Sequence, residues 1–178
     1  MKNDTTWTPG EANNGVWKQK LLLYLALTFD LRVLVETGTC DGGTLGGVYS
    51  VFEACHSIEL SKYYYDISRE RFKDKINGHL YHENSGLFLR HLLTKIPDVP
   101  TLFWLDAHSS GGLTADAGDP LPAELEAIFD LRPNALIVVD DQQEQSLPAV
   151  REGWIRDYRC GSLMIHRGGY VSPPFEDA

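Results

Sequence analysis

The stretch RVLVETGTCDGGT, residues 32–44, joins a short aliphatic run directly to a turn that is rich in glycine. The aliphatic residues predict a buried strand that ends at Glu36. The glycines at positions 38, 42 and 43 predict a tight turn into a helix, where backbone amides are open to a ligand. A tight turn that binds nothing fits the same residues. The stretch therefore predicts a strand, a turn and a helix, and makes the turn a candidate binding site.

Helical and strand patterns alternate along the rest of the chain. The expected strands are Arg32–Glu36, Cys55–Leu60, His79–Glu83, Thr101–Asp106, Ala135–Asp140, Asp157–Cys160 and Ser162–Arg167. The expected helices are Val16–Thr28, Tyr63–Asn77, Gly86–Lys95, Pro122–Phe129 and a short one near Leu147–Trp154. This alternation predicts an α/β fold with a single Rossmann-like, doubly wound sheet that is mostly parallel. Because Gly161 alone separates the last two strands, we expect an antiparallel strand at the C-terminus.

Length and composition fit one acidic globular domain. The chain has 178 residues, is 43% hydrophobic and carries a formal net charge of −9. We expect a domain over residues 16–169, with a flexible segment at 1–15 and a tail at 170–178. Negative charge without a Lys/Arg block argues against nucleic acid as a partner, and no apolar run is long enough to span a bilayer. Three scattered cysteines without a CxxC pair indicate a reduced, cytoplasmic setting.

All the predicted parallel strands end in polar residues, at the edge where open α/β sheets bind ligands. Glu59 ends the second strand, about 20 residues after the glycine turn, and an acid at that place suits the hydroxyls of a ribose. The glycines do not fit the GxGxxG pattern, and no P-loop lysine follows them. The spacing therefore disfavours a dinucleotide or a P-loop nucleotide, while Glu59 still favours a ligand that contains a ribose.

The segments VETGTCDGGT (35–44) and SIEL (57–60) resemble the first two motifs of class I S-adenosylmethionine-dependent methyltransferases. The resemblance covers about residues 16–168 and implies S-adenosyl-L-methionine as the cofactor. It implies that the glycine turn surrounds the methionine part, that Glu59 binds the ribose and that Asn84 borders the adenine, although an Asp is commoner than Asn84 in the family. The implied cofactor-binding residues are Glu36, Thr37, Gly38, Thr39, Gly42, Gly43, Thr44, Glu59, Leu60, Asn84, Ser85 and Asp106.

Three carboxylates follow two neighbouring strands of the predicted sheet. Asp106 ends the fourth strand, and Asp140 and Asp141 end the fifth. Because adjacent strands lie about 5 Å apart, these acids should converge at one rim, where they would raise one another's pKa unless a cation joins them. Carboxylate oxygens suit Mg²⁺, Mn²⁺ or Ca²⁺. Capping of a following helix or loop is the alternative role for the same residues.

The three acids also resemble the ligand pattern of divalent-metal-dependent O-methyltransferases, including the catechol type and the group of macrocin O-methyltransferase and cephalosporin-hydroxylase-like proteins. This resemblance implies Asp106, Asp140 and Asp141 as metal ligands, with Asp106 also at the catalytic centre. The chain departs from it in a glycine-rich insert at 109–120 and in lacking, near Asp106, the lysine base of the catechol enzymes. We expect His108 to accept the proton of the acceptor instead, because an unperturbed histidine titrates near neutrality. A loop hydrogen bond is its alternative role.

The expected function is metal-assisted O-methylation of a hydroxyl on a small molecule or a sugar. Two other classes remain open, namely a non-catalytic cofactor-binding module of the same fold and a nucleotide-dependent enzyme on a related sheet. A chain of 178 residues leaves little room for a separate acceptor domain. We expect the acceptor to be recognised by the N-terminus, by residues 109–120 or by another subunit, which leaves a homo-oligomer open.

Overall fold

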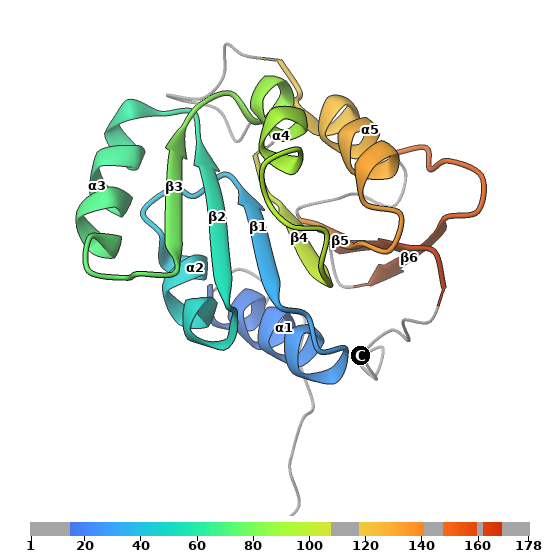
Figure 1. The fold of residues 1–178 in the computed structure, drawn as a ribbon, viewed down its shortest axis with the longest axis horizontal. Helices are drawn as coiled ribbons and strands as arrows, with labels where there is room; N and C mark the ends of the chain where they lie inside the picture. The colour runs from blue at the N-terminus through green and yellow to red at the C-terminus, as the bar shows by residue number, and fades with distance from the viewer. Residues whose placement is uncertain (1–14, 108–117, 141–147, 160–161, 169–178) are drawn as a thin grey trace, which may run out of the picture.

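A central sheet covered by helices on both faces forms the body of the chain (Figure 1). The computed structural model describes residues 15–107, 118–140, 148–159 and 162–168. The strands in these ranges are β1 (Val33–Thr37), β2 (Ala54–Glu59), β3 (Gly78–His82), β4 (Thr101–Leu105), β5 (Leu136–Val139), β6 (Ile155–Arg159) and β7 (Ser162–His166). The helices are α1 (Gly15–Thr28), α2 (Gly43–Val48), the 3-10 turn η2 (Tyr49–Val51), α3 (Lys62–Phe72), α4 (Ser85–Leu93) and α5 (Leu121–Leu131).

The strands lie in the order β3-β2-β1-β4-β5-β7-β6. The pairs from β3 to β5 are parallel, whereas β7 runs antiparallel to both β5 and β6. The α/β class, the mostly parallel sheet and the antiparallel C-terminal strand predicted from the sequence are confirmed. The tight connection between β6 and β7 accounts for the reversal, because a parallel pair needs a long crossover.

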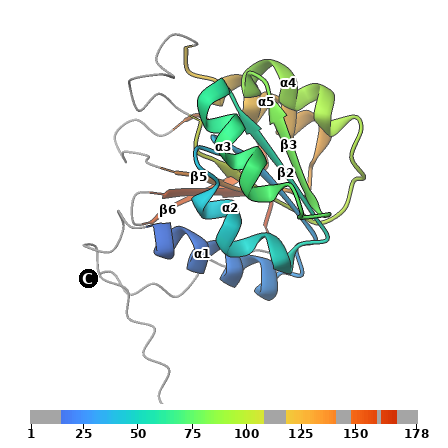
Figure 2. The same cartoon turned by 90° about the vertical axis from the view of Figure 1, so that its left-hand side faces the viewer.

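The core lies in two layers, one on each face of the sheet. Alternate residues of β4 point to opposite layers, so Phe103 packs with α4 and α5 while Trp104 packs with α1 and α2. Figure 2 shows α1 and α2 below the sheet and α4 and α5 above it. β4 is buried along its whole length because helices cover both faces, and this explains its apolar sequence from Leu102 to Leu105.

Two predicted helices differ in the structure. Residues 148–154 form no helix, and the chain instead turns at Gly153, whose φ is +84°, before β6 begins at Ile155. The predicted helix that ends at Asn77 stops at Phe72. Asn77 lies in the turn before β3, where its side-chain amide donates to the carbonyls of Tyr49 and Phe52 at 2.9 and 3.0 Å. These bonds tie Asn77 to the turn before β2, so it is not available to extend α3.

The predicted segment 1–15 and the predicted tail 170–178 lie almost entirely outside the described residues, so their flexibility stays a prediction. Among the residues that are described, no helix combines the length and the apolar character needed to cross a membrane.

Candidate active site at the carboxyl ends of the strands

The strand order reverses between β1 and β4, because β2 and β3 follow on one side of β1 while β4 and β5 lie on the other. Ligands of open α/β sheets bind outside the carboxyl ends of the strands at such a point. Leu105 pairs with Thr37 of β1 and with Val139 of β5. Asp106 and Asp140 therefore stand side by side, each one residue beyond the aligned strand ends, and next to the glycine turn that follows β1.

The glycine turn after β1 runs very close to the end of β4. Gly38 has φ +81°, and a Cβ atom at this position would lie 2.3 Å from the carbonyl oxygen of Asp106. Only glycine allows this backbone conformation and this approach without strain. The turn continues to Gly42 and Gly43, where α2 begins, and Thr44 lies in the first turn of that helix. The residues predicted to surround the methionine part thus form one continuous segment at the switch point, with Cys40 and Asp41 exposed.

Glu59 fastens the glycine turn to the end of β2. Its Oε2 accepts a hydrogen bond from the Cys40 amide at 2.8 Å, and its Oε1 accepts one from the Ser61 amide at 2.7 Å. The carboxylate is 4% exposed, and its charge-assisted hydrogen bonds fix its position. Each carboxylate oxygen has a second lone pair that could accept a hydrogen bond from a ribose hydroxyl.

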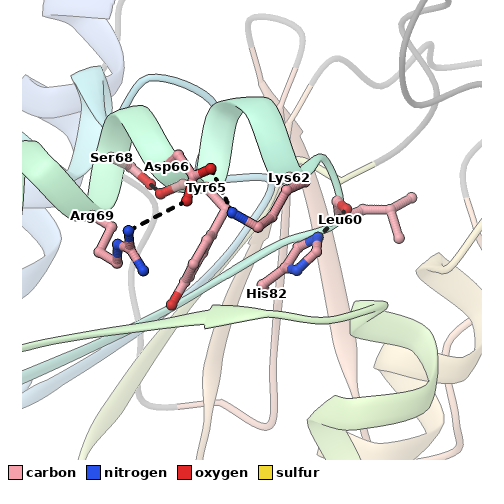
Figure 3. A network of polar contacts seen from close by, with 7 residues as sticks. All are labelled: Leu60, Lys62, Tyr65, Asp66, Ser68, Arg69 and His82. Carbon is pink, nitrogen blue, oxygen red and sulfur yellow. Dashed lines mark hydrogen bonds and ion pairs between the residues drawn. The ribbon is translucent and has the colours of Figure 1, made fainter.

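Leu60, directly after Glu59, has an exposed side chain and a backbone that is held in place. Leu60 is 39% exposed, and its carbonyl accepts a hydrogen bond from Nε2 of His82 at 3.1 Å. The ring of Tyr65 stacks on His82 with the centroids 5.3 Å apart, so that α3, β3 and the end of β2 meet here (Figure 3). The predicted cofactor residue Leu60 is therefore held by its backbone while its side chain reaches solvent.

Glu36 lies beneath the rim, on the α2 side of the sheet. It accepts a short hydrogen bond from the Ser57 hydroxyl, which in turn lies 2.6 Å from the hydroxyl of Thr39. Burial raises the pKa of Glu36 to about 8, and the Ser57 hydroxyl opposes this shift. The carboxyl is 1% exposed, so Glu36 supports the glycine turn from below through Ser57 and Thr39.

A second buried acid, Glu124 of α5, lies on the opposite face of the sheet near the predicted adenine side. It is 1% exposed, and burial raises its pKa to about 7 against the opposing effect of the Ser85 and Thr37 hydroxyls. Asn84 precedes α4 and Ser85 begins it. Two of the predicted cofactor residues, Thr37 and Ser85, thus lie beside the Glu124 carboxyl, which was not predicted as a site residue.

Lys18 of α1 joins the two strand-end acids that the sequence predicted to converge. Its Nζ lies 3.1 Å from Oδ2 of Asp106 and in direct contact with Oδ2 of Asp140. Burial lowers the pKa of Lys18, but Asp106 and Asp140 together raise it more, so the net shift is upward. The predicted convergence of Asp106 and Asp140 is therefore present, and the cation between them is an ammonium group.

A divalent ion does not fit these residues as they stand, because the Oδ2 atoms of both acids already face Lys18. Asp141 and His108 lie outside the described residues, so their predicted roles as metal ligand and proton acceptor stay predictions. Within the described ranges, no group of three His, Cys, Asp or Glu side chains has the geometry to hold a metal ion.

Comparison with known proteins gives a structural likeness only. No family model and no curated protein matches the chain. A proposed caffeoyl-CoA O-methyltransferase from Staphylococcus aureus superposes with a TM-score of 0.64 and 12% identity, over 85% of this chain and 83% of that one. The O-methyltransferase TomG from Streptomyces achromogenes, solved with S-adenosylmethionine, has a TM-score of 0.58 and 19% identity, over 73% and 57%.

The same fold also occurs in a protein that is not named as a methyltransferase. Spermidine synthase from Thermotoga maritima superposes with a TM-score of 0.56 and 13% identity, over 87% of this chain and 60% of that one. Identities this low establish the arrangement of the elements and nothing about the substrate. The described residues have the Rossmann-like α/β fold that S-adenosylmethionine-dependent methyltransferases share.

Proposed function

We propose that this chain is an S-adenosylmethionine-dependent methyltransferase that methylates a hydroxyl oxygen on a small molecule or a sugar. The observation that carries the proposal is the contact between the glycine turn and Glu59 at the switch point of the sheet, with the Cys40 amide 2.8 Å from the carboxylate. A backbone turn open to a ligand and a fixed acid beside it suit a cofactor that contains both a charged tail and a ribose.

Each part of the rim has a separate task in this function. S-adenosylmethionine supplies an electrophilic methyl group when it is bound. The backbone at Gly38 and Gly42 would hold its methionine part, Glu59 would accept hydrogen bonds from the ribose, and Ser85 at the start of α4 would border the adenine. Such a site accelerates transfer mainly by holding the two reacting atoms close and in line.

In this proposal His108 would accept the proton of the acceptor hydroxyl, while the bound cofactor would supply the methyl group to the acceptor oxygen and keep the sulfur as a thioether. Asp106, two residues earlier in the sequence, directly follows the end of β4. The divalent ion predicted from the sequence, Mg²⁺, Mn²⁺ or Ca²⁺, is not carried into the proposal because Lys18 holds both of the described acids.

Calorimetric titration of the chain with S-adenosylmethionine, S-adenosylhomocysteine and NAD tests the cofactor. We expect the first two to bind and NAD not to bind. E59Q should weaken binding by roughly 10- to 100-fold, the effect of losing a charge-assisted hydrogen bond, whereas E126Q on the exposed side of α5 should not change it. Binding of NAD alone would contradict the proposal and favour the nucleotide-dependent alternative.

Turnover separates an enzyme from a binding module. Formation of S-adenosylhomocysteine with a panel of sugars and aromatic alcohols should be detectable for the parent chain. H108A should slow it by roughly 10²- to 10⁴-fold, the usual contribution of a general base, without loss of cofactor affinity. Cofactor binding without turnover on any hydroxyl acceptor would favour the non-catalytic module.

A further inference from the structure

Lys18 lies in the only described helix that precedes the sheet, 88 residues before Asp106 in the sequence. The Lys18 side chain is 20% exposed, and the Asp140 side chain that it contacts is 2% exposed. The indole of Trp104 lies beneath the ammonium, with the ring centroid 5.7 Å from Nζ. The charge is therefore fixed by two carboxylates and one aromatic face, in a setting that is largely screened from water.

Asp140 has a partner for each carboxylate oxygen. Oδ2 contacts Lys18, and Oδ1 accepts a hydrogen bond from the Ser162 hydroxyl of β7 at 3.1 Å. A buried carboxylate is stable only when it is both paired and hydrogen bonded. Asp140 meets both conditions within the described residues without a metal ion. Removal of Lys18 would leave this carboxylate buried beside a second one.

Lys18 and a divalent ion would compete for the same place. A metal ion that joined Asp106 to Asp140 would lie about 2.0–2.6 Å from one oxygen of each. The Oδ2 atoms of both residues already face Nζ, so the ammonium occupies the point between them. The ammonium group and a divalent ion cannot both lie between the two carboxylates, because the cations would repel each other at close range.

We propose that the Lys18 ammonium group takes the place of a metal ion between Asp106 and Asp140. It excludes a divalent ion from these two carboxylates and positions the Asp106 carboxylate beside the glycine turn. If the chain is a methyltransferase, methyl transfer should proceed without a divalent ion, and this part of the inference rests on the proposed function. The ion exclusion itself does not, because it concerns the free protein.

Electron paramagnetic resonance of Mn²⁺ tests the exclusion directly. The chain and its K18Q and K20Q variants are titrated with Mn²⁺ alone, Lys20 being an exposed lysine on the same helix. We expect the parent and K20Q to leave the signal of free Mn²⁺ unchanged, and K18Q to bind the ion at least about tenfold more tightly than the parent. D140N added to K18Q should abolish the new binding.

Two results would overturn the inference. The first is Mn²⁺ binding by the parent chain that D140N removes, because the ion would then displace Lys18. The second is a folded K18Q variant that still leaves Mn²⁺ free. If K18Q does not fold, K18Q/D140N decides, since removal of one carboxylate should restore folding. A double variant that also stays unfolded would refute the ion-pair role of Lys18.

Failure here and failure of the proposed function are distinguishable. Mn²⁺ binding by the parent would leave the titration with S-adenosylmethionine unaffected, and absence of cofactor binding would leave the Mn²⁺ result unaffected. Where turnover is present, full activity in excess EDTA is the expected outcome. Loss of activity in EDTA that Mg²⁺ restores would contradict metal-free transfer.

Discussion

Replacement of Gly38 by alanine should destabilise the fold by about 2–5 kcal/mol, through two separate effects. The backbone at Gly38 has φ +81°, a left-handed conformation that costs a residue with a side chain about 1–2 kcal/mol. The new Cβ would also lie 2.3 Å from the carbonyl oxygen and 2.7 Å from the carbonyl carbon of Asp106. Forcing atoms into a packed site of this kind typically costs about 1–3 kcal/mol.

The contact is with backbone, so it cannot be relieved by turning a side chain. The Asp106 amide donates to the Thr37 carbonyl at 3.1 Å, which holds the end of β4 against β1. Relief would require β1 and β4 to separate at the rim. G38A should therefore disturb the glycine turn and the position of Asp106 together, and weaken cofactor binding in addition to stability.

G118A is the matched control, because Gly118 also has a positive φ of +74° but a Cβ there would meet no atom of the described residues within 4 Å. It should lose only the conformational part, about 1–2 kcal/mol. Urea unfolding followed by tryptophan fluorescence measures the free energy of unfolding of both variants. In thermal unfolding, a chain of this length should lose about 2–4 °C of Tm per kcal/mol. If G38A is no less stable than G118A, the close approach of the turn to β4 is refuted.

Three further predictions concern buried polar groups. Because the pKa of Glu124 is raised from 4.5 to about 7 on folding, the free energy of unfolding should fall as pH rises through this window. In urea unfolding at several pH values, E124Q should show a smaller fall and E126Q the same fall as the parent. The pKa of His56 is lowered from 6.5 to about 4, mainly by burial, so stability should fall as pH drops through this window. An H56F variant with an unchanged acid slope would contradict that assignment. R132M should lose about 2–4 kcal/mol, because the buried guanidinium donates to the carbonyls of Leu93, the last residue of α4, and Ile96 at 2.7 and 2.9 Å. R90M on the surface should behave like the parent.

The sheet was predictable because its strands carry strong, short-range signals. β5 is wholly apolar, β4 is apolar after Thr101, and β1 is apolar up to Val35, and a polar residue ends or directly follows each strand at the rim. Their adjacency follows from chain order and from the preference of parallel strands for helical crossovers, so the convergence of Asp106 and Asp140 could be inferred without coordinates. The site residues that strand ends supply are therefore open to prediction from sequence.

The residues that helices supply were missed, although each carries a signal. Lys18 stands three and four residues before Leu21 and Leu22, which are both buried, so it lies on the packed side of α1. Glu124 likewise follows Leu121 by three positions and precedes Ile128 by four, along the buried face of α5. A charged residue in register with an apolar helix face needs a buried partner. That partner is set by tertiary packing, which the local pattern does not specify.

Packing of α1 sets the charge of the rim and the position of the glycine turn at once. Lys18 binds the two acids, and the next residue, Gln19, donates from Nε2 to the carbonyl of Gly43 at 3.0 Å, where α2 begins. Consecutive helical residues point about 100° apart, so the two side chains reach different parts of the rim from one helix. Because α1 is anchored by buried leucines, the same contacts that bury its apolar face also deliver the ammonium group. The electrostatics of the candidate site thus depend on the docking of a helix that contributes no strand end, and a change that loosens α1 should alter the rim before it unfolds the sheet.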